Sequence, residues 1–327
     1  MQGFLRSETE RLAQRRLPEK AEESRWVARD GWPIRRVDWP APAEHRGSLL
    51  FVPGRGDFLE KYLESLNHWN KRGWQVTALD WRGQALSGRL GADSVTGHIE
   101  DFATWVADLA AFWADWTAQT PGPHVLVAHS MGGHLALRAV AESQVRPDAL
   151  VLSAPMLGFV RHGLPPVLSR LVARVMCTLG DPRRPAWGRN GQGGEKPGQP
   201  PAGREALLTH DAARYVDELW WREHRPGLGM GPPSWGWLRA ALASMQGLDR
   251  REALARVDVP VFIAATDADR LVDWGAIERA SRWIPGAQLL RFGPEARHEL
   301  LREADPIRDR VIAAIDDFLD RAAPSPK

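Results

Sequence analysis

Ser130 is the residue whose setting most suggests chemistry, because it stands in the stretch VAHSMGGHL. This stretch has the small-x-Ser-x-Gly form of a nucleophile elbow, the sharp turn from a strand into a helix that exposes a serine hydroxyl. Gly132 supplies the small residue two places after the serine, whereas Ala128 stands where the first glycine is usual. The motif alone is a weak signal in a chain with 30 glycines, so its weight depends on the elements that surround it.

The predicted elements around Ser130 are those that the motif requires. Residues 124–128 (HVLVA) form a short apolar run that predicts a buried strand, and residues 131–143 have helical spacing. The N-terminus of that helix would favour negative charge developing next to the serine. We therefore interpret Ser130 as a nucleophile, with a helix-capping serine as the alternative.

A serine hydroxyl needs a base, and in this topology an acid and a histidine follow the serine, each just past a later strand. The predicted strand at 261–265 is followed by TDADRLVD, which offers Asp267, Asp269 and Asp273 as the acid. The predicted strand at 288–292 is followed by GPEARHELL, so His298 is the expected base. The order Ser–Asp–His at these places is harder to produce by chance than the elbow alone.

The turn after the predicted strand at 48–52 is the expected second half of an oxyanion hole. Its sequence, PGRGD, contains glycines that let the backbone approach a ligand closely. The backbone N–H groups of Arg55 and Met131 are the expected donors. His129 and His134 flank the serine, and we interpret both as structural, because a base next in sequence would point away from the Oγ atom.

Composition restricts the classes of function. Hydrophobic residues make up 43% of the 327 residues, charged residues 26%, and the net charge is +2. These values indicate a soluble globular protein, and without a basic run with interleaved aromatics we expect no nucleic-acid partner. The lone Cys177 and the histidine spacing predict no metal site, and the chemistry needs no cofactor. No stretch resembles a signal peptide or a membrane span, so we expect a cytoplasmic protein.

Strands alternate with helices along most of the chain, which predicts a mostly parallel central sheet with helices on both faces. We expect a charged N-terminal segment at 1–25 and an α/β core in two parts, at 26–154 and 249–322. The segment 155–248 interrupts the alternation and is predicted to be a helical lid, with a flexible loop at 181–203.

The motifs together resemble one known family. FVPGRGDF, LDWRGQALSGR, VAHSMGGHLALR, LTHDAARY, TDADRLVD and ARHELLREAD are similar to the α/β-hydrolases of the monoacylglycerol lipase and bacterial lysophospholipase group, also called serine aminopeptidase-like. The resemblance implies Ser130 as nucleophile, Asp269 as acid and His298 as base, with Asp267 as the main rival for the acid. Ala128 and Ala85 depart from the family pattern, each replacing a glycine.

The resemblance implies a serine hydrolase that cleaves esters of lipophilic substrates, either lysophospholipids or monoacylglycerols. Three alternatives stay open: a carboxylesterase for small esters, a prolyl-type aminopeptidase, and a non-catalytic binding protein on the same scaffold. The aminopeptidase would need carboxylates in its pocket for the substrate's amine, and the lid segment offers Asp217 and Glu218.

One stretch of the predicted lid is amphipathic. PPVLSRLVARVMCTL has apolar residues on one side, from Val167 to Met176, and two arginines, Arg170 and Arg174, elsewhere on the helix. We interpret it first as packing within the lid. The alternatives are that it lines an acyl pocket or makes peripheral contact with a membrane.

Overall fold

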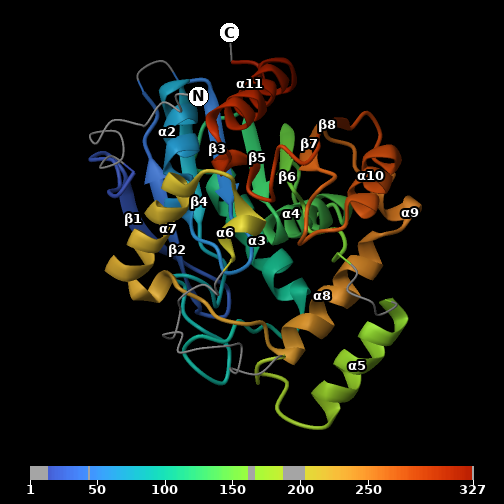
Figure 1. The fold of residues 1–327 in the computed structure, drawn as a ribbon. Coiled ribbons are helices and arrows are strands. Elements are labelled where there is room, and N and C mark those ends of the chain that lie inside the picture. Colours follow the sequence, from blue (N-terminus) through green and yellow to red (C-terminus); the bar gives the residue numbers. More distant parts are fainter. Residues whose placement is uncertain (1–13, 43–44, 161–165, 187–202, 326–327) are drawn as a thin grey trace.

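One eight-stranded sheet organises the part of the chain that the computed structural model describes, residues 14–42, 45–160, 166–186 and 203–325 (Figure 1). Its strand order is β1-β2-β4-β3-β5-β6-β7-β8. Strand β2 runs antiparallel to both of its neighbours, and the remaining strands are parallel, so the predicted mostly parallel sheet is confirmed. The strands span Glu22–Val27 (β1), Pro33–Trp39 (β2), Gly47–Val52 (β3), Trp74–Leu79 (β4), His124–His129 (β5), Ala149–Ser153 (β6), Val261–Thr266 (β7) and Gln288–Phe292 (β8).

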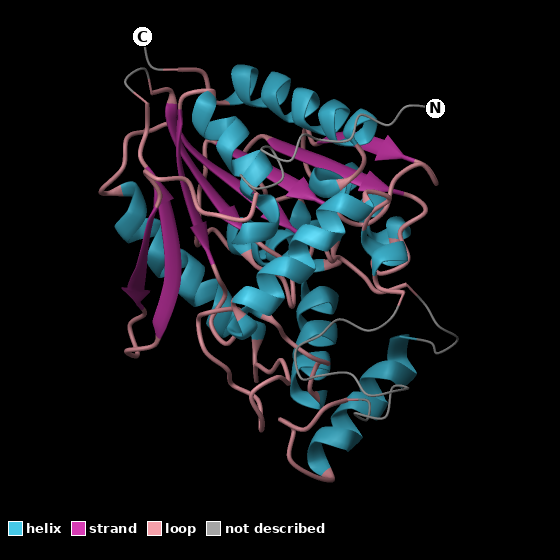
Figure 2. Ribbon diagram, turned by 60° about the vertical axis from the view of Figure 1, so that its left-hand side comes forward, coloured by secondary structure: helices cyan, strands magenta, loops and turns pink. Residues whose placement is uncertain are grey.

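Helices cover both faces of the sheet (Figure 2). Alternate residues of a strand point to opposite faces, so Leu49 and Phe51 enter one apolar cluster while Leu50 and Val52 enter the other. The first cluster is closed by α2 (Leu63–Lys71) and α11 (Asp305–Ala322). The second is closed by α3 (Phe102–Thr117), α4 (Met131–Ala141) and α10 (Trp274–Trp283). Burial on both faces explains why the parallel strands read as continuous apolar runs in the sequence.

Strand β1 is an element that the sequence did not predict. It takes up Glu22 to Arg25, which we had assigned to a charged segment outside the core. Most of its side chains are exposed, and it pairs only with β2 at the edge of the sheet. The charged side chains of an edge strand hide it from a search for apolar runs, because only its backbone needs a partner.

The segment between β6 and β7 contains several helices. They are α5 (Pro166–Thr178), α6 (Glu205–Leu208), α7 (Ala212–His224), the short η2 (Pro226–Leu228), α8 (Trp235–Leu248) and α9 (Arg251–Leu254). In Figure 1, α5 and α8 lie at the opposite end of the molecule from α11. Residues 187–202, most of the predicted flexible loop at 181–203, fall outside the described residues.

Helix α5 exposes its apolar side chains. Ala173 is buried, but the others named here are exposed: Val167, Leu168, Leu171, Val172 and Val175. Our first interpretation, packing of this apolar side within the lid, is therefore wrong for these five residues. No helix in the described ranges is both long and apolar enough to cross a membrane.

Candidate active site

Ser130 occupies a strained turn between β5 and α4. Its backbone has φ 52° and ψ −116°, a combination that residues with a side chain rarely adopt. The turn is held by a hydrogen bond to β6, in which the Ser130 N–H donates to Ser153 O at 3.0 Å. A Cβ atom at position 132 would lie 2.4 Å from Pro53 O, so only glycine fits there. The elbow therefore requires Gly132 for space, whereas Ala128 is fully buried in the sheet and its methyl group is accommodated.

A continuous chain of hydrogen bonds joins three of the predicted site residues. His298 Nε2 lies 2.9 Å from Ser130 Oγ, and His298 Nδ1 lies 2.7 Å from Asp269 Oδ2. The other carboxylate oxygen of Asp269 accepts the backbone N–H groups of Leu271, at 2.7 Å, and Val272, at 3.1 Å. These amides fix the carboxylate, the carboxylate fixes the imidazole, and the imidazole reaches the serine oxygen.

The two other aspartates of TDADRLVD point elsewhere. Asp267 forms an ion pair with Arg291 near the surface. Asp273 caps the N-terminus of α10, where its side chain accepts from Gly275 N. Of the three candidates that the sequence offered, the structure brings Asp269 to His298.

Burial and charge act in opposite directions on this pair. Burial lowers the pKa of His298, but the charge of Asp269 and its hydrogen bond outweigh that effect and raise it. Burial raises the pKa of Asp269, but the charge of His298, its hydrogen bond and the two backbone amides lower it. The arrangement thus keeps Asp269 ionised and stabilises a proton on His298 relative to an isolated buried histidine.

The two predicted oxyanion donors are available. The turn of Gly54 and Arg55 lies against the serine, because a Cβ at position 54 would be 3.1 Å from Ser130 Cβ. Its neighbouring amides are occupied: Gly54 N donates to Asp57 Oδ2, and Gly56 N to Gln84 Oε1. Within the described ranges, the backbone amides of Arg55 and Met131 donate to no other group, so both remain free for a ligand.

The histidines beside the serine have structural contacts. His129 Nδ1 lies 3.1 Å from Ser153 O, and His134 Nε2 lies 2.7 Å from Ser244 Oγ. Burial, aided by the charge of His298, lowers the pKa of His129 to about 4, and burial lowers that of His134 to about 3. Both rings are therefore neutral near pH 7. The His129 ring packs against His298, with centroids 4.9 Å apart.

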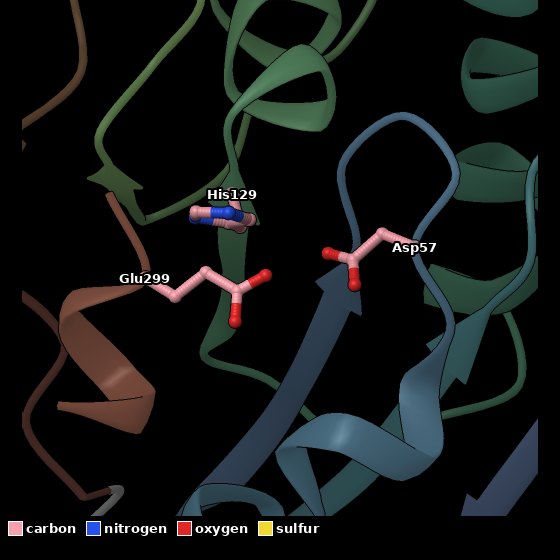
Figure 3. Close-up of side chains that lie close together, drawn as sticks. All are labelled: Asp57, His129 and Glu299. Carbon is pink, nitrogen blue, oxygen red and sulfur yellow. The ribbon is translucent and has the colours of Figure 1, made fainter. Parts of the chain in front are cut away.

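A buried cluster of charges lies next to His298 and was not found from the sequence. Asp57, His129 and Glu299 point toward one another (Figure 3), with ligand atoms close enough to hold a metal ion. The ammonium group of Lys61, however, lies 2.8 Å from Asp57 Oδ1 and also bonds Glu299. A metal ion here would have to displace this lysine. The site geometry therefore fits an ion-pair cluster better than a metal centre.

This cluster connects three parts of the molecule. Lys61 Nζ also lies 3.1 Å from Glu218 Oε2 on α7, and Arg302 bonds both Glu218 and Glu299. Asp57 belongs to the oxyanion turn and Glu299 follows His298, so the cluster ties both to a helix between β6 and β7. No local sequence pattern indicates this cluster, because its members are far apart along the chain.

The two carboxylates that a peptidase pocket would have used are engaged in ion pairs. Glu218 pairs with Lys61, Arg222 and Arg302, and it is fully buried. Asp217 pairs with Arg15, at 2.9 Å. Neither carboxylate is free to receive the amine of a peptide substrate.

Comparison with known proteins gives the family. A family model described as serine aminopeptidase, S33, matches residues 43–305. Lysophospholipase L2 of Escherichia coli K12 is 30% identical over 313 residues, which cover 92% of this chain and 88% of that protein. A monoacylglycerol lipase of Mycolicibacterium smegmatis is 29% identical over 43% of this chain and 48% of its own length.

Solved structures share the fold. A soluble variant of monoglyceride lipase from Saccharomyces cerevisiae superposes with a TM-score of 0.73 at 18% identity, covering 93% of this chain and 96% of that one. A carboxyl esterase from Bacillus coagulans gives a TM-score of 0.69, also at 18% identity, over 93% and 99% of the two chains. The predicted α/β-hydrolase fold is confirmed.

Asp269→Asn should lower kcat by about three to four orders of magnitude, because an asparagine cannot hold the required tautomer or stabilise the imidazolium. It should also remove the contributions that raise the pKa of His298. A base works when neutral, so the rise of kcat/KM with pH should move to lower pH in this variant. Ester hydrolysis measured from pH 4 to 9 tests both effects.

Asp267→Asn is the matched control, since Asp267 contacts Arg291 and not His298. It should keep wild-type activity and the wild-type pH profile. If the Asp267 variant lost activity and the Asp269 variant kept it, the acid would have to be reassigned.

Proposed function

Since the chain belongs to the serine aminopeptidase (S33) family of α/β-hydrolases and is an ester hydrolase, we propose that it cleaves carboxylic esters of lipophilic substrates through Ser130, His298 and Asp269. The observation that carries the proposal is the hydrogen-bond chain from Asp269 through His298 to Ser130. Two free backbone amides, Arg55 in the turn after β3 and Met131 in the elbow after β5, complete the set of groups that acyl transfer requires.

The acylation step follows from the positions of these groups. His298 Nε2 accepts the Ser130 proton as Oγ attacks the ester carbonyl, and the imidazolium is stabilised by Asp269. The carbonyl oxygen becomes negative and accepts hydrogen bonds from the backbone N–H groups of Arg55 and Met131. One such donor contributes about 3 kcal/mol in the transition state. His298 then gives its proton to the departing alcohol, which leaves an acyl-enzyme on Ser130.

Deacylation uses the same groups in reverse order. His298 is neutral again after the alcohol has left, so it can take a proton from water as the water oxygen attacks the acyl carbonyl. The bond between the carbonyl carbon and Ser130 Oγ breaks, and His298 returns the proton to Oγ. The fatty acid leaves, and the serine is regenerated.

The relatives' names point to the substrate class. One relative is named a lysophospholipase and another a monoacylglycerol lipase. We therefore propose that the substrate is a lipid ester that carries one acyl chain. The engaged state of Asp217 and Glu218 weighs against an aminopeptidase, and the complete hydrogen-bond chain weighs against a non-catalytic binding protein.

Ser130→Ala should abolish hydrolysis of monoacylglycerol and lysophospholipid while leaving the fold intact, because a methyl group cannot attack the ester. A fluorophosphonate probe should label Ser130 in the wild type and label nothing in the variant. Turnover in the variant at the wild-type rate would contradict the proposed nucleophile, with circular dichroism as the control for folding.

We also propose that α5 is where the enzyme meets a lipid surface. Five of its apolar side chains are exposed, with Leu171 at 55% and Val167 at 68%, and Leu179 just beyond the helix is 76% exposed. Arg170 and Arg174 are on the same helix, where they could face anionic head groups. An enzyme with this substrate class gains access to its substrate by binding the surface that holds it.

Leu168→Ser combined with Leu171→Ser should reduce binding to vesicles of phosphatidylglycerol and phosphatidylcholine at least fivefold, because two buried apolar contacts with the membrane are lost. Cosedimentation measures this binding. Hydrolysis of soluble p-nitrophenyl butyrate should stay at the wild-type level.

Val216→Ser combined with Leu219→Ser on α7 is the matched control, since these side chains are also exposed. Equal vesicle binding by both double variants and the wild type would contradict a role for α5.

A further inference from the structure

In the turn after β3, the amides on either side of the free one are both held by side chains. Gly54 N donates to Asp57 Oδ2 at 3.1 Å, and Gly56 N donates to Gln84 Oε1 at 2.8 Å. The Arg55 amide lies between these two. We propose that Gln84 is a positioning residue, which fixes the direction of the Arg55 N–H so that it meets the oxyanion. This inference rests on the proposed function, in which that amide binds the negative oxygen.

The geometry of the peptide unit explains why the neighbouring amides matter. Each unit is planar, so the Arg55 N–H changes direction only by rotation about the bonds that join its unit to the next ones. Glycines at positions 54 and 56 make such rotation easy, because they lack a Cβ atom, and Gly56 has φ +61°. The bond to Asp57 holds the unit before, and the bond to Gln84 holds the unit after. The unit between them therefore has a fixed direction.

Carbonyl groups of the same turn are also held by side chains. Pro53 O accepts a hydrogen bond from Trp81 Nε1 at 2.8 Å, and Gly56 O accepts one from Arg222 Nη2 at 3.2 Å. Together with the two amides, these bonds fix the turn from several directions. The Arg55 N–H has no acceptor in the described chain, so it stays available for a ligand.

Gln84 also contacts the residue that carries the second donor. Its carbonyl oxygen must face Gly56 N, because an NH2 group cannot accept a hydrogen bond from an amide. The NH2 group is thereby directed to Met131 Sδ, 3.9 Å away. A thioether is a weak acceptor, so this contact locates the Met131 side chain but binds it only weakly. One side chain therefore lies against both segments that form the proposed oxyanion hole.

The support that Gln84 gives is itself rigid. The residue is 3% exposed, in the turn that follows β4. Its N–H donates to Trp81 O and its carbonyl accepts from Ser87 N, both at 2.9 Å. Because the residue is buried, water does not compete for its bond to Gly56 N, and that bond is stronger than a solvent-exposed one.

This support should act on the reaction more than on substrate binding. Without the Gln84 carbonyl, the buried Gly56 N–H would lack an acceptor, and the turn would rotate to find one. The Arg55 N–H would turn with it and lose its direction toward the oxyanion. A donor that is directed in advance stabilises the negative transition state more than the neutral ester. Its loss should therefore lower kcat and change KM little.

The test compares p-nitrophenyl butyrate with p-nitrophenyl thionobutyrate, in which sulfur replaces the carbonyl oxygen. Sulfur is a poor hydrogen-bond acceptor, so the thionoester gains little from the two amides. The measured quantity is the ratio of kcat/KM for the oxygen ester to kcat/KM for the thionoester. Damage to the triad or to the fold slows both substrates and cancels in this ratio, whereas damage to the oxyanion hole lowers it.

Gln84→Met keeps the length of the side chain and removes its carbonyl group. It should lower kcat for the oxygen ester at least tenfold, leave KM within twofold of the wild type, and lower the ratio at least fivefold. Gln84→Asn withdraws the carbonyl by one methylene and should lower the ratio in the same way, which covers the case that the methionine variant does not fold. Gln84→Glu keeps an acceptor oxygen at the same reach and should retain most of the wild-type ratio.

Ser48→Ala is the matched control. It removes a buried hydrogen bond, from Ser48 Oγ to Pro121 O at 2.7 Å, near the start of β3 and thus far from the turn that follows this strand. The variant should be less stable to heat, as circular dichroism measures, and should keep the wild-type ratio.

Three results would overturn the proposal. The first is a wild-type ratio in Gln84→Met and Gln84→Asn, even with lower activity on both substrates, because equal losses indicate a structural role alone. The second is a ratio in Gln84→Glu as low as in Gln84→Met, because the acceptor oxygen would then not be what matters. The third is an equal fall of the ratio in Ser48→Ala.

These outcomes are distinct from failure of the proposed function. If the Ser130→Ala protein hydrolysed the oxygen ester at the wild-type rate, the nucleophile assignment would fail whatever the ratio. If the wild type reacted through Ser130 and the Gln84 variants kept its ratio, only the positioning role of Gln84 would fail.

Discussion

The backbone of Ser130 is the constraint on which the site depends. Its φ of 52° is sterically costly, and the turn persists because β5 and α4 are both fixed around it. Strand β5 pairs with β3 on one side and β6 on the other, and α4 packs against the sheet. The parallel arrangement also brings the ends of β3, β5, β7 and β8 to one edge of the sheet. Arg55, Ser130, Asp269 and His298 all follow these ends, so residues far apart in sequence meet at one place.

The cluster around Lys61 extends this arrangement from the sheet to the helices beyond it. A buried lysine is stable only when carboxylates surround it, and here they come from the oxyanion turn, from α7 and from the loop that carries His298. One ammonium group therefore fixes the positions of the three segments relative to one another. Removing any one carboxylate would leave the others facing an incompletely paired cation, so their positions are interdependent.

Two features of the sequence led to correct predictions: the periodicity of its apolar residues and the order of its elements along the chain. The strands of the parallel core, the long helices between them and the positions of Ser130 and His298 follow from apolar runs and from the order of the elements. Strand β1 was missed because edge pairing uses the backbone and leaves its charged side chains in solvent. The acid could be narrowed to Asp269 only by resemblance, since three aspartates share one loop and only their side-chain directions distinguish them. The Lys61 cluster joins residues 57 to 299, and no local pattern reports such a contact.

The distribution of charge separates the frame of this site from the part that meets substrate. The buried cations that support the frame, such as Lys61, Arg214 and Arg302, face carboxylates of the same chain, so their charge is neutralised before any ligand arrives. The groups at the reacting position differ, because the amides of Arg55 and Met131 have no acceptor in the described chain. In the proposed mechanism, the transition state supplies the oxyanion that these amides lack. These donors gain an acceptor only as negative charge develops, so they stabilise the transition state more than the bound substrate.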